Sequence, residues 1–245
     1  MIPIHDDNPT HITPWVTFVL LGLCVGAFLG QWWLSSAAET RALYSFGLIP
    51  AVFTGAGTLP PSLDVLPPIF TVFTAVFLHG GILHLLGNLI YLWIFGNNIE
   101  DAMGHGRFIV FFALCAFAAA IAQVVAAPDS QIPMIGASGA VAGILGAYLL
   151  LYPNATVTVI LHLVIILHVV RVPASWLLVV WFAVQIISSL FTAPGTPGVA
   201  WYAHIGGFAA GLLLIPLFKH DHVPLLHPSS RPIHHRSAEI DAAGN

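Results

Sequence analysis

Charged residues are the component that this sequence lacks most. Asp, Glu, Lys and Arg together account for 7% of its 245 residues, whereas hydrophobic residues account for 58%. Soluble domains carry about 25% charged residues, so the composition predicts an integral membrane protein. Six Lys and Arg against ten Asp and Glu give a net charge of -4. This composition leaves no extended basic surface, and we therefore exclude nucleic acid as a partner.

Cysteine is also scarce, with two residues in the whole chain. Cys24 and Cys115 each lie within a long apolar run, where a thiol packs as a small hydrophobe. The sequence therefore implies no disulfide framework.

The N-terminus likewise has no basic residue before its first apolar run. That run is about twenty residues long, enough for a membrane-spanning helix, which predicts a retained span and not a cleaved signal peptide.

What is abundant is apolar sequence in long runs. These runs predict six membrane spans, at residues 14–34, 81–96, 107–127, 136–152, 174–192 and 201–218. Pro and Gly interrupt residues 35–80, which stay apolar, so we expect a long first loop with interfacial helical pieces. Residues 155–170 alternate Thr, Val and Ile, a pattern that favours a shallow interfacial segment over another crossing.

The predicted fold class is therefore an all-α membrane protein, a six-helix bundle with a long interfacial first loop. We divide the chain into an N-terminal segment at 1–13, the membrane bundle at 14–218, and a His- and Pro-rich tail at 219–245 that we expect to be disordered. With both termini in the cytoplasm, five of the six basic residues lie on the cytoplasmic side and Arg41 lies outside, which follows the positive-inside rule. Spans two, four and six then begin at the outer face.

Polar residues from these three spans converge at that outer level. Ser138, His204 and His84 each lie in the first turn of a predicted span, and Asn88 follows His84 by one helical turn. Polar groups at such positions are costly and indicate function. Any one of these residues alone would more often only form a hydrogen bond between helices. Four of them at the same depth in the membrane favour a functional site.

A serine beside a histidine predicts nucleophilic chemistry. The imidazole accepts the hydroxyl proton, and the alkoxide attacks an acyl carbon. The backbone N–H groups of Ser138 and Gly139 lie in the first turn of a helix and can hold the resulting oxyanion. His84 and Asn88 can add donors from their side chains.

Other catalytic arrangements are excluded by what the spans lack. All ten acids fall outside the predicted spans, so we expect a Ser–His dyad without a third acidic member and exclude an intramembrane aspartyl protease. Lys219 lies about 22 Å along a helix from His204, which excludes a Ser–Lys dyad. No His-Glu-x-x-His motif of a zinc protease occurs. We expect no metal site and no cofactor.

The dyad needs two spans in close contact, and both carry small residues at helical spacing. Gly139 and Gly143 line one span, and Ala203, Gly207 and Gly211 line the other. Such residues let helix backbones approach closely in lipid. These small residues are explained equally by ordinary helix packing and by the need to place Ser138 against His204, and both explanations can hold at once.

At this point the sequence resembles the rhomboid family of intramembrane serine proteases, in its bacterial type with six transmembrane helices. The matching motifs are Gly136-Ala137-Ser138-Gly139, Ala203-His204-Ile205-Gly206-Gly207, and the segment from His79 through His84 to Asn88. Glu100, after Phe95-Gly96 and before Gly104, is similar to the family's turn after the second helix. The resemblance covers roughly residues 10 to 218.

The resemblance implies a serine endopeptidase with catalytic Ser138 and His204, in a water-filled cavity that opens to the outer face. His84 and Asn88 would help hold the oxyanion, and His79 would be structural or line the cavity. The partners implied are membrane lipid and single-span or other transmembrane protein substrates, cleaved near the outer face. The implied location is a bacterial cytoplasmic (inner) membrane.

The sequence departs from the family pattern at two places. Phe70-Thr71 stands where many members carry Trp-Arg, which bears on loop stability and lipid contacts. Ala142 stands where some members carry a tyrosine that stacks on the base histidine, which bears on the fixing of the imidazole ring. Neither departure removes a catalytic atom.

Two other functions stay open. A catalytically silent rhomboid-like binder or chaperone would use the same cavity to recognise membrane spans. A transporter or channel is disfavoured, because intramembrane charges and paired broken helices are absent from the predicted spans. The tail histidines are candidates for metal binding, but a solvated disordered tail is favoured; they are His220, His222, His227, His234 and His235.

Overall fold

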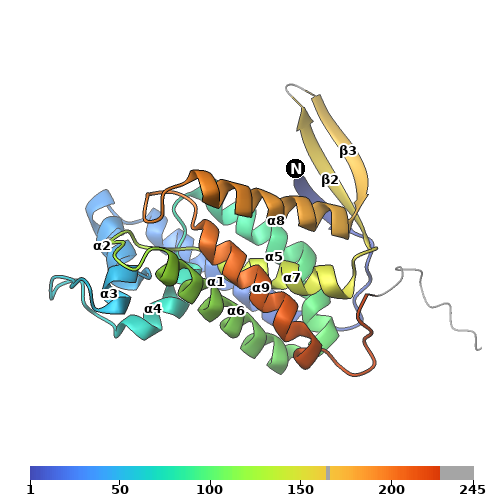
Figure 1. Cartoon of the computed structure of the whole chain (residues 1–245), viewed down its shortest axis with the longest axis horizontal. Helices are drawn as coiled ribbons and strands as arrows, with labels where there is room; N and C mark the ends of the chain where they lie inside the picture. Colours follow the sequence, from blue (N-terminus) through green and yellow to red (C-terminus); the bar gives the residue numbers. More distant parts are fainter. Residues whose placement is uncertain (164–165, 227–245) are drawn as a thin grey trace, which may run out of the picture.

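The computed structural model describes residues 1–163 and 166–226, which form a helical bundle with a small sheet at one end (Figure 1). Five helices among these residues are long and apolar enough to cross a membrane. They are α1 (Trp15–Trp32), α5 (Ile82–Met103), α6 (His105–Ala126), α8 (Ala174–Phe191) and α9 (Trp201–Phe218). They overlap five of the six predicted spans, so a long apolar helix is confirmed at each of these five places.

A sixth apolar helix, α7 (Ser138–Leu151), is shorter than the others. Its 14 residues rise about 21 Å at 1.5 Å per residue, less than the roughly 30 Å of a hydrocarbon core. It lies at the centre of the bundle, where it packs against α5, α6, α8 and α9. Eleven of its residues are buried, so protein and not lipid surrounds this helix.

The helix α5 continues beyond the predicted span at 81–96, and this corrects one expectation. Glu100 and Asp101 lie inside α5, so the prediction that every acid falls outside the spans is wrong for these two. The carboxylate of Glu100 accepts the backbone N–H groups of Val16 (2.9 Å) and Thr17 (2.8 Å) and the Thr17 hydroxyl (2.7 Å). First-turn N–H groups have no acceptor within their own helix, so Glu100 caps α1 and is itself satisfied.

The first loop is helical in pieces, as predicted. Its elements are α2 (Ser36–Phe46), α3 (Pro50–Thr54), α4 (Pro68–Thr74) and the 3-10 helix η1 (Ala75–Phe77). Pro50 and Pro68 each begin a helix, where the N–H that proline lacks would have no partner in any case. These short helices gather at the end of the bundle opposite the sheet (Figure 1).

An antiparallel sheet makes the all-α prediction wrong. Its strands, in the order β1-β2-β3, are β1 (Ile2–Asp6), β2 (Thr156–Leu163) and β3 (Ile166–Pro173). The alternation in residues 155–170 belongs to a strand with one buried face, because Val157 and Val159 are fully buried whereas Thr158 is not. The prediction that this stretch is not another crossing helix is confirmed, and the hairpin projects from the bundle beside the start of α8 (Figure 1).

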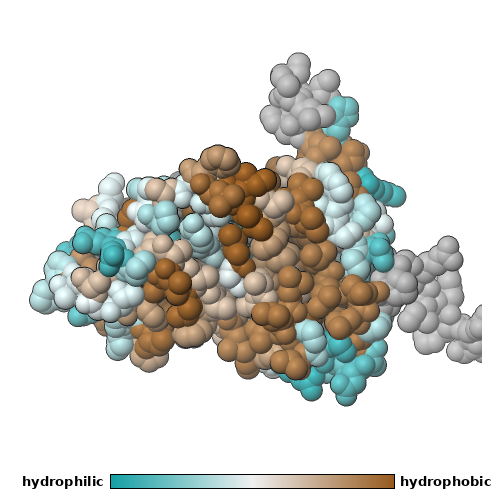
Figure 2. Space-filling view, in the orientation of Figure 1, coloured by the Kyte–Doolittle hydropathy of each residue, from teal (hydrophilic) through white to brown (hydrophobic). Residues whose placement is uncertain are grey.

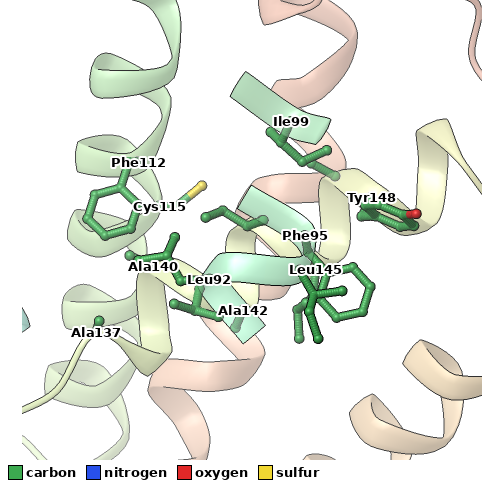
Figure 3. Close-up of a cluster of buried hydrophobic side chains, with 14 of the residues drawn as sticks. Leu92, Phe95, Ile99, Phe112, Cys115, Ala137, Ala140, Ala142, Leu145 and Tyr148 are labelled. Atoms are coloured by element: carbon green, nitrogen blue, oxygen red, sulfur yellow. The ribbon is translucent and has the colours of Figure 1, made fainter. Parts of the chain in front are cut away.

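The centre of the bundle depends on the close approach of α7 and α9. A Cβ on Gly207 would overlap the carbonyl oxygen of Gly139, and a Cβ on Gly211 would overlap that of Gly143. The predicted packing through small residues is confirmed. Larger side chains from α5, α6 and α7 fill the core around them (Figure 3), among them Leu92, Phe95, Ile99, Phe112, Leu145 and Tyr148.

The outside of the helices is apolar as well. Leu83, Val125, Leu213 and Leu217 are each at least 74% exposed. In Figure 2, hydrophobic surface covers the middle of the helices, and hydrophilic residues gather toward the two ends. Such a surface suits hydrocarbon and not water, and the chain is an integral membrane protein.

The residues after α9 return across the sheet end of the bundle. The N–H of His220 donates to the carbonyl of Ala102, and that of Leu226 to the carbonyl of Leu150, both at 2.8 Å. Residues 219–226 of the predicted tail are therefore held against the bundle. Residues 227–245, which make up the rest of that tail, lie outside the described residues.

Candidate active site

The turn that leads into α7 depends on Gly136. Its φ of 107° lies in the region that favours glycine, and a Cβ here would overlap the ring of His84. The Gly136 N–H donates to the carbonyl of Ala75 at 2.8 Å, which ties the turn to η1. Ser138 follows as the first residue of α7, so its hydroxyl lies at the end of a helix and not along its side.

Ser138 and His204 are in direct contact. The Ser138 hydroxyl lies 2.7 Å from Nε2 of His204, a residue in the first turn of α9 that is 8% exposed. Gly207 lies one turn further along α9, and its contact with Gly139 brings the two helices together. A serine hydroxyl bonded to an imidazole nitrogen is the arrangement that activates serine as a nucleophile.

The pair opens onto a cavity of about 730 Å³, within the size range of small-molecule and substrate sites. Its wall is largely apolar, and the side chains of Ser138, His204, His84 and Asn88 line it together with Gly139. These five residues come from α5, α7 and α9. The structure thus brings the residues predicted from three separate spans to one cavity.

Hydrogen-bond donors surround this cavity. The backbone N–H groups of Ser138 and Gly139 belong to the first turn of α7, where the helix dipole favours negative charge. Asn88 uses one Nδ2 hydrogen on the carbonyl of His84 (3.0 Å), and its amide has a second. The N–H of Gly80 donates to Nδ1 of His84 at 3.4 Å, which favours the tautomer with the proton on Nε2, where the ring can donate.

His79 lies behind this cavity and does not line it. It is fully buried, with its ring centroid 5.2 Å from that of His84. Its backbone N–H donates to Oε1 of Gln31, and its carbonyl accepts from Nε2 of the same amide, both at 3.1 Å. Burial lowers the pKa of His79 to about 4, so the ring is neutral at pH 7, and it supports His84 from behind.

Two residues of α8 that the sequence did not predict as part of the site contact His204. Oε1 of Gln185 lies 2.8 Å from Nδ1 of His204, and the indole of Trp181 lies beside the same imidazole, with ring centroids 5.8 Å apart. The indole rings of Trp181 and Trp201 both contact His204. Ala142, which stands where some family members carry a stacking tyrosine, has no ring to place against it. A third member is predicted from the sequence only where an acid stands in a span, and the neutral amide of Gln185 gives no charge signal.

Acids and metal ligands are sparse around the cavity. In the described part of the chain, neither Asp nor Glu lines it, and no group of three or more His, Cys, Asp or Glu residues there is arranged to hold a metal ion. The rings of His220 and His222 stack at 5.4 Å. The other tail histidines proposed as metal ligands, His227, His234 and His235, lie outside the described residues.

Comparison with known proteins decides the family. A family model described as "Rhomboid domain" matches residues 68–220, more than half of the 245 residues. The chain belongs to the rhomboid family. The matched range contains all of the predicted site residues, from His79 to His204, and the resemblance stated from the sequence motifs is confirmed at the level of the family.

Individual rhomboid relatives come from plants, fungi and bacteria. The chain is 28% identical over 205 residues to RHOMBOID-like protein 4 of Arabidopsis thaliana, covering 79% of this chain and 44% of that protein. It is 26% identical over 207 residues to Rhomboid protein 1, mitochondrial, of Saccharomyces cerevisiae, covering 81% and 51%. It is 41% identical over 76 residues to Rhomboid protease GluP of Bacillus subtilis, covering 31% and 14%. The chain thus spans about half or less of these relatives, and the bacterial type stays a prediction.

Proposed function

We propose that this rhomboid protein is an intramembrane serine endopeptidase that cleaves transmembrane substrates. The observation that carries the proposal is the 2.7 Å contact between the Ser138 hydroxyl and Nε2 of His204 on the wall of a cavity inside a membrane bundle. The kinship with a protein named Rhomboid protease GluP supports the same reaction class.

The chemistry follows from the geometry. Nε2 of His204 accepts the proton of Ser138 as Oγ attacks the carbonyl carbon of the scissile peptide bond. The carbonyl oxygen becomes an oxyanion, which the N–H of Gly139 and the side chains of His84 and Asn88 stabilise. The imidazolium of His204 then protonates the leaving amine, and an acyl-enzyme forms. Water, deprotonated by His204, releases the acyl group and restores Ser138.

The substrate must offer an exposed peptide bond, because an intact helix hides its carbonyl groups in its own hydrogen bonds. Substrates with helix-weakening Gly or Pro near the cut therefore fit the site best. Glycines on the cavity wall, Gly80, Gly87 and Gly198 among them, leave room for an extended backbone.

We further propose that α7 is a sixth span and that both termini are cytoplasmic. The site then lies at the outer end of α7, and cleavage occurs near the outer face. A bacterial cytoplasmic membrane is the proposed location, and no metal or cofactor takes part. In this proposal residues 1–13 form the cytoplasmic N-terminus and residues 14–218 the protease domain. Of the predicted tail at 219–245, residues 219–226 contact the bundle and residues 227–245 lie outside the described residues.

A second candidate function is a silent binder that holds membrane spans in the same cavity. The largely apolar wall suits such binding. The two functions differ in whether Ser138 reacts.

One experiment separates them. Purified protein in liposomes is incubated with single-span substrates, each with a Gly- or Pro-containing segment at a different depth. We expect cleavage by the wild type and none by Ser138→Ala or His204→Ala, with all three proteins equally folded by circular dichroism. Substrate binding without cleavage by any of the three would establish the binder instead.

A further inference from the structure

A chain of hydrogen bonds runs from α8 through the base to the nucleophile. Nε2 of Gln185 donates to the carbonyl of Trp181 (3.0 Å), and Oε1 of the same amide faces Nδ1 of His204 (2.8 Å). Nε2 of His204 then faces the hydroxyl of Ser138 (2.7 Å). A carbonyl oxygen accepts and cannot donate, so the bond to Trp181 fixes which end of the Gln185 amide meets the histidine.

The direction of this chain sets the tautomer of His204. Because Oε1 of Gln185 is an acceptor, Nδ1 of His204 must carry the proton, which leaves Nε2 bare. A bare Nε2 accepts the hydroxyl proton of Ser138, as a general base must. With the opposite tautomer, two lone pairs would meet at Gln185, and Nε2–H could only donate to the Ser138 oxygen, so the hydroxyl proton would have no acceptor in His204.

The position of Gln185 is costly unless it has such a role. It is the one amide among the 18 residues of α8, and it is 4% exposed. A buried polar side chain in a membrane helix is expensive and indicates function. The indole of Trp181 packs beside the imidazole from the same helix and limits its rotation.

We propose that Gln185 is a positioning residue that holds His204 as the Nδ1–H tautomer with Nε2 directed at Ser138. This inference rests on the proposed protease function. Gln185 neither gains nor loses a proton: the proton of Ser138 moves to Nε2 of His204 and on to the leaving amine. Through the reaction the amide oxygen accepts from Nδ1 and lies against the positive charge that forms on the imidazolium.

The test compares two substitutions. Gln185→Met keeps the length of the side chain and removes the acceptor, and we expect kcat to fall by about 10- to 100-fold through lost orientation while KM changes by less than about twofold. Gln185→Glu keeps an oxygen acceptor for Nδ1 and is expected to recover most of that loss. A nitrogen NMR spectrum of ¹⁵N-histidine-labelled protein should show Nδ1 of His204 protonated in the wild type and a tautomer mixture in Gln185→Met.

The matched control is Asn98→Leu, which removes a buried amide at the other end of the bundle, where Nδ2 of Asn98 donates to the carbonyl of Asn8 (2.9 Å). We expect it to lower thermal stability and leave kcat unchanged. An unaltered kcat in Gln185→Met, or a fall in kcat matched by Asn98→Leu, would overturn the role of Gln185. A wild type without Ser138-dependent cleavage would instead refute the protease function, and the tautomer spectrum would still test Gln185.

Discussion

The two ends of the bundle use buried polar groups in opposite ways. At the end where α7 begins, Ser138, His204 and His84 face a cavity of about 730 Å³. At the end where α7 finishes, two buried acids accept hydrogen bonds from other elements of the fold. There the Tyr148 hydroxyl donates to Oδ2 of Asp6 at 2.6 Å, and Glu100 accepts hydrogen bonds from α1 and lies 2.6 Å from Nδ1 of His105.

Because of this difference, we expect the polar groups at one end of the bundle to contribute to reactivity and those at the other end to contribute to stability. A polar group whose hydrogen bonds all end on protein holds the fold, and its removal leaves buried donors without acceptors. A polar group that faces a cavity can still form a hydrogen bond with a ligand, and its neighbours control its orientation. We therefore expect substitutions near the sheet to change the free energy of unfolding, and substitutions near the cavity to change kcat.

The largest effect is expected at Gly207, where a substitution should change both kcat and stability. Gly207→Val places a side chain against the carbonyl of Gly139, which forces α9 away from α7 and separates His204 from Ser138. Cleavage should fall by about 100-fold or more, because a shift of about 1 Å at a catalytic pair has that cost. Thermal stability should also fall, by roughly 1–3 kcal/mol.

Gly26→Val is the matched control for this substitution, since Gly26 also lies in a long helix and has nothing within 4 Å of an added Cβ. It should cleave substrate at the wild-type rate. Equal loss of activity in both variants would mean that helix propensity, and not the approach of α7 to α9, decides the effect.

The next largest effect should be on stability alone. Glu100→Ala removes the acceptor for two N–H groups and one hydroxyl of α1, and we expect a loss of roughly 3 kcal/mol. Glu100→Gln should lose less, because one acceptor oxygen remains. Thermal unfolding in detergent measures the loss, and kcat measured well below the melting temperature should match the wild type. A lower kcat in fully folded Glu100→Ala protein would show that this end of the bundle also affects reactivity.

Asp6 should make stability depend on pH. Burial raises the pKa of Asp6 from 3.8 to about 6, against the opposing effects of the Tyr148 hydroxyl and His5. Because the folded pKa is the higher one, this stabilisation is complete below pH 3.8 and is lost as pH rises through 6. Between pH 4.5 and 7.5 the wild type should lose roughly 2 kcal/mol that Asp6→Asn does not. Parallel curves for the two proteins would show that Asp6 is not the group responsible.

The smallest effect is expected from Tyr148→Phe. It removes one hydrogen bond to Asp6 and should cost about 1 kcal/mol at neutral pH. Since Tyr148 and Ser138 lie near opposite ends of the same helix, kcat should stay within about twofold of the wild type. Unfolding and cleavage measured on one preparation test both parts, and a large drop in kcat would show that the two ends are coupled.

The sequence predicts what depends on local pattern. Apolar runs predict five long helices, four of them to within about two residues at each end, whereas α5 extends beyond its predicted end. Ser138 and His204 stand out as polar residues in the first turns of apolar segments. The small residues of two of these segments also indicate which helices touch. Each of these features is decided within one stretch of about twenty residues.

What the sequence could not predict depends on partners far along the chain. The strand β1 pairs with β2 more than 150 residues later, so the alternation around Val157 does not reveal which strand pairs with it. The helix α5 continues past its predicted end because α1 supplies partners for Glu100. Gln185 was missed for a further reason: an uncharged amide becomes recognisable only when its neighbour is known to be His204.

Covalent labelling of Ser138 tests most directly whether the contact with His204 makes this hydroxyl a nucleophile. Protein in lipid is treated with a fluorophosphonate, and the modified residue and its rate of modification are determined by mass spectrometry. We expect one adduct, on Ser138, that forms at least about 100-fold more slowly in His204→Ala, because a base activates the hydroxyl. Absence of an adduct on Ser138, or an adduct that forms equally fast without His204, would contradict this expectation.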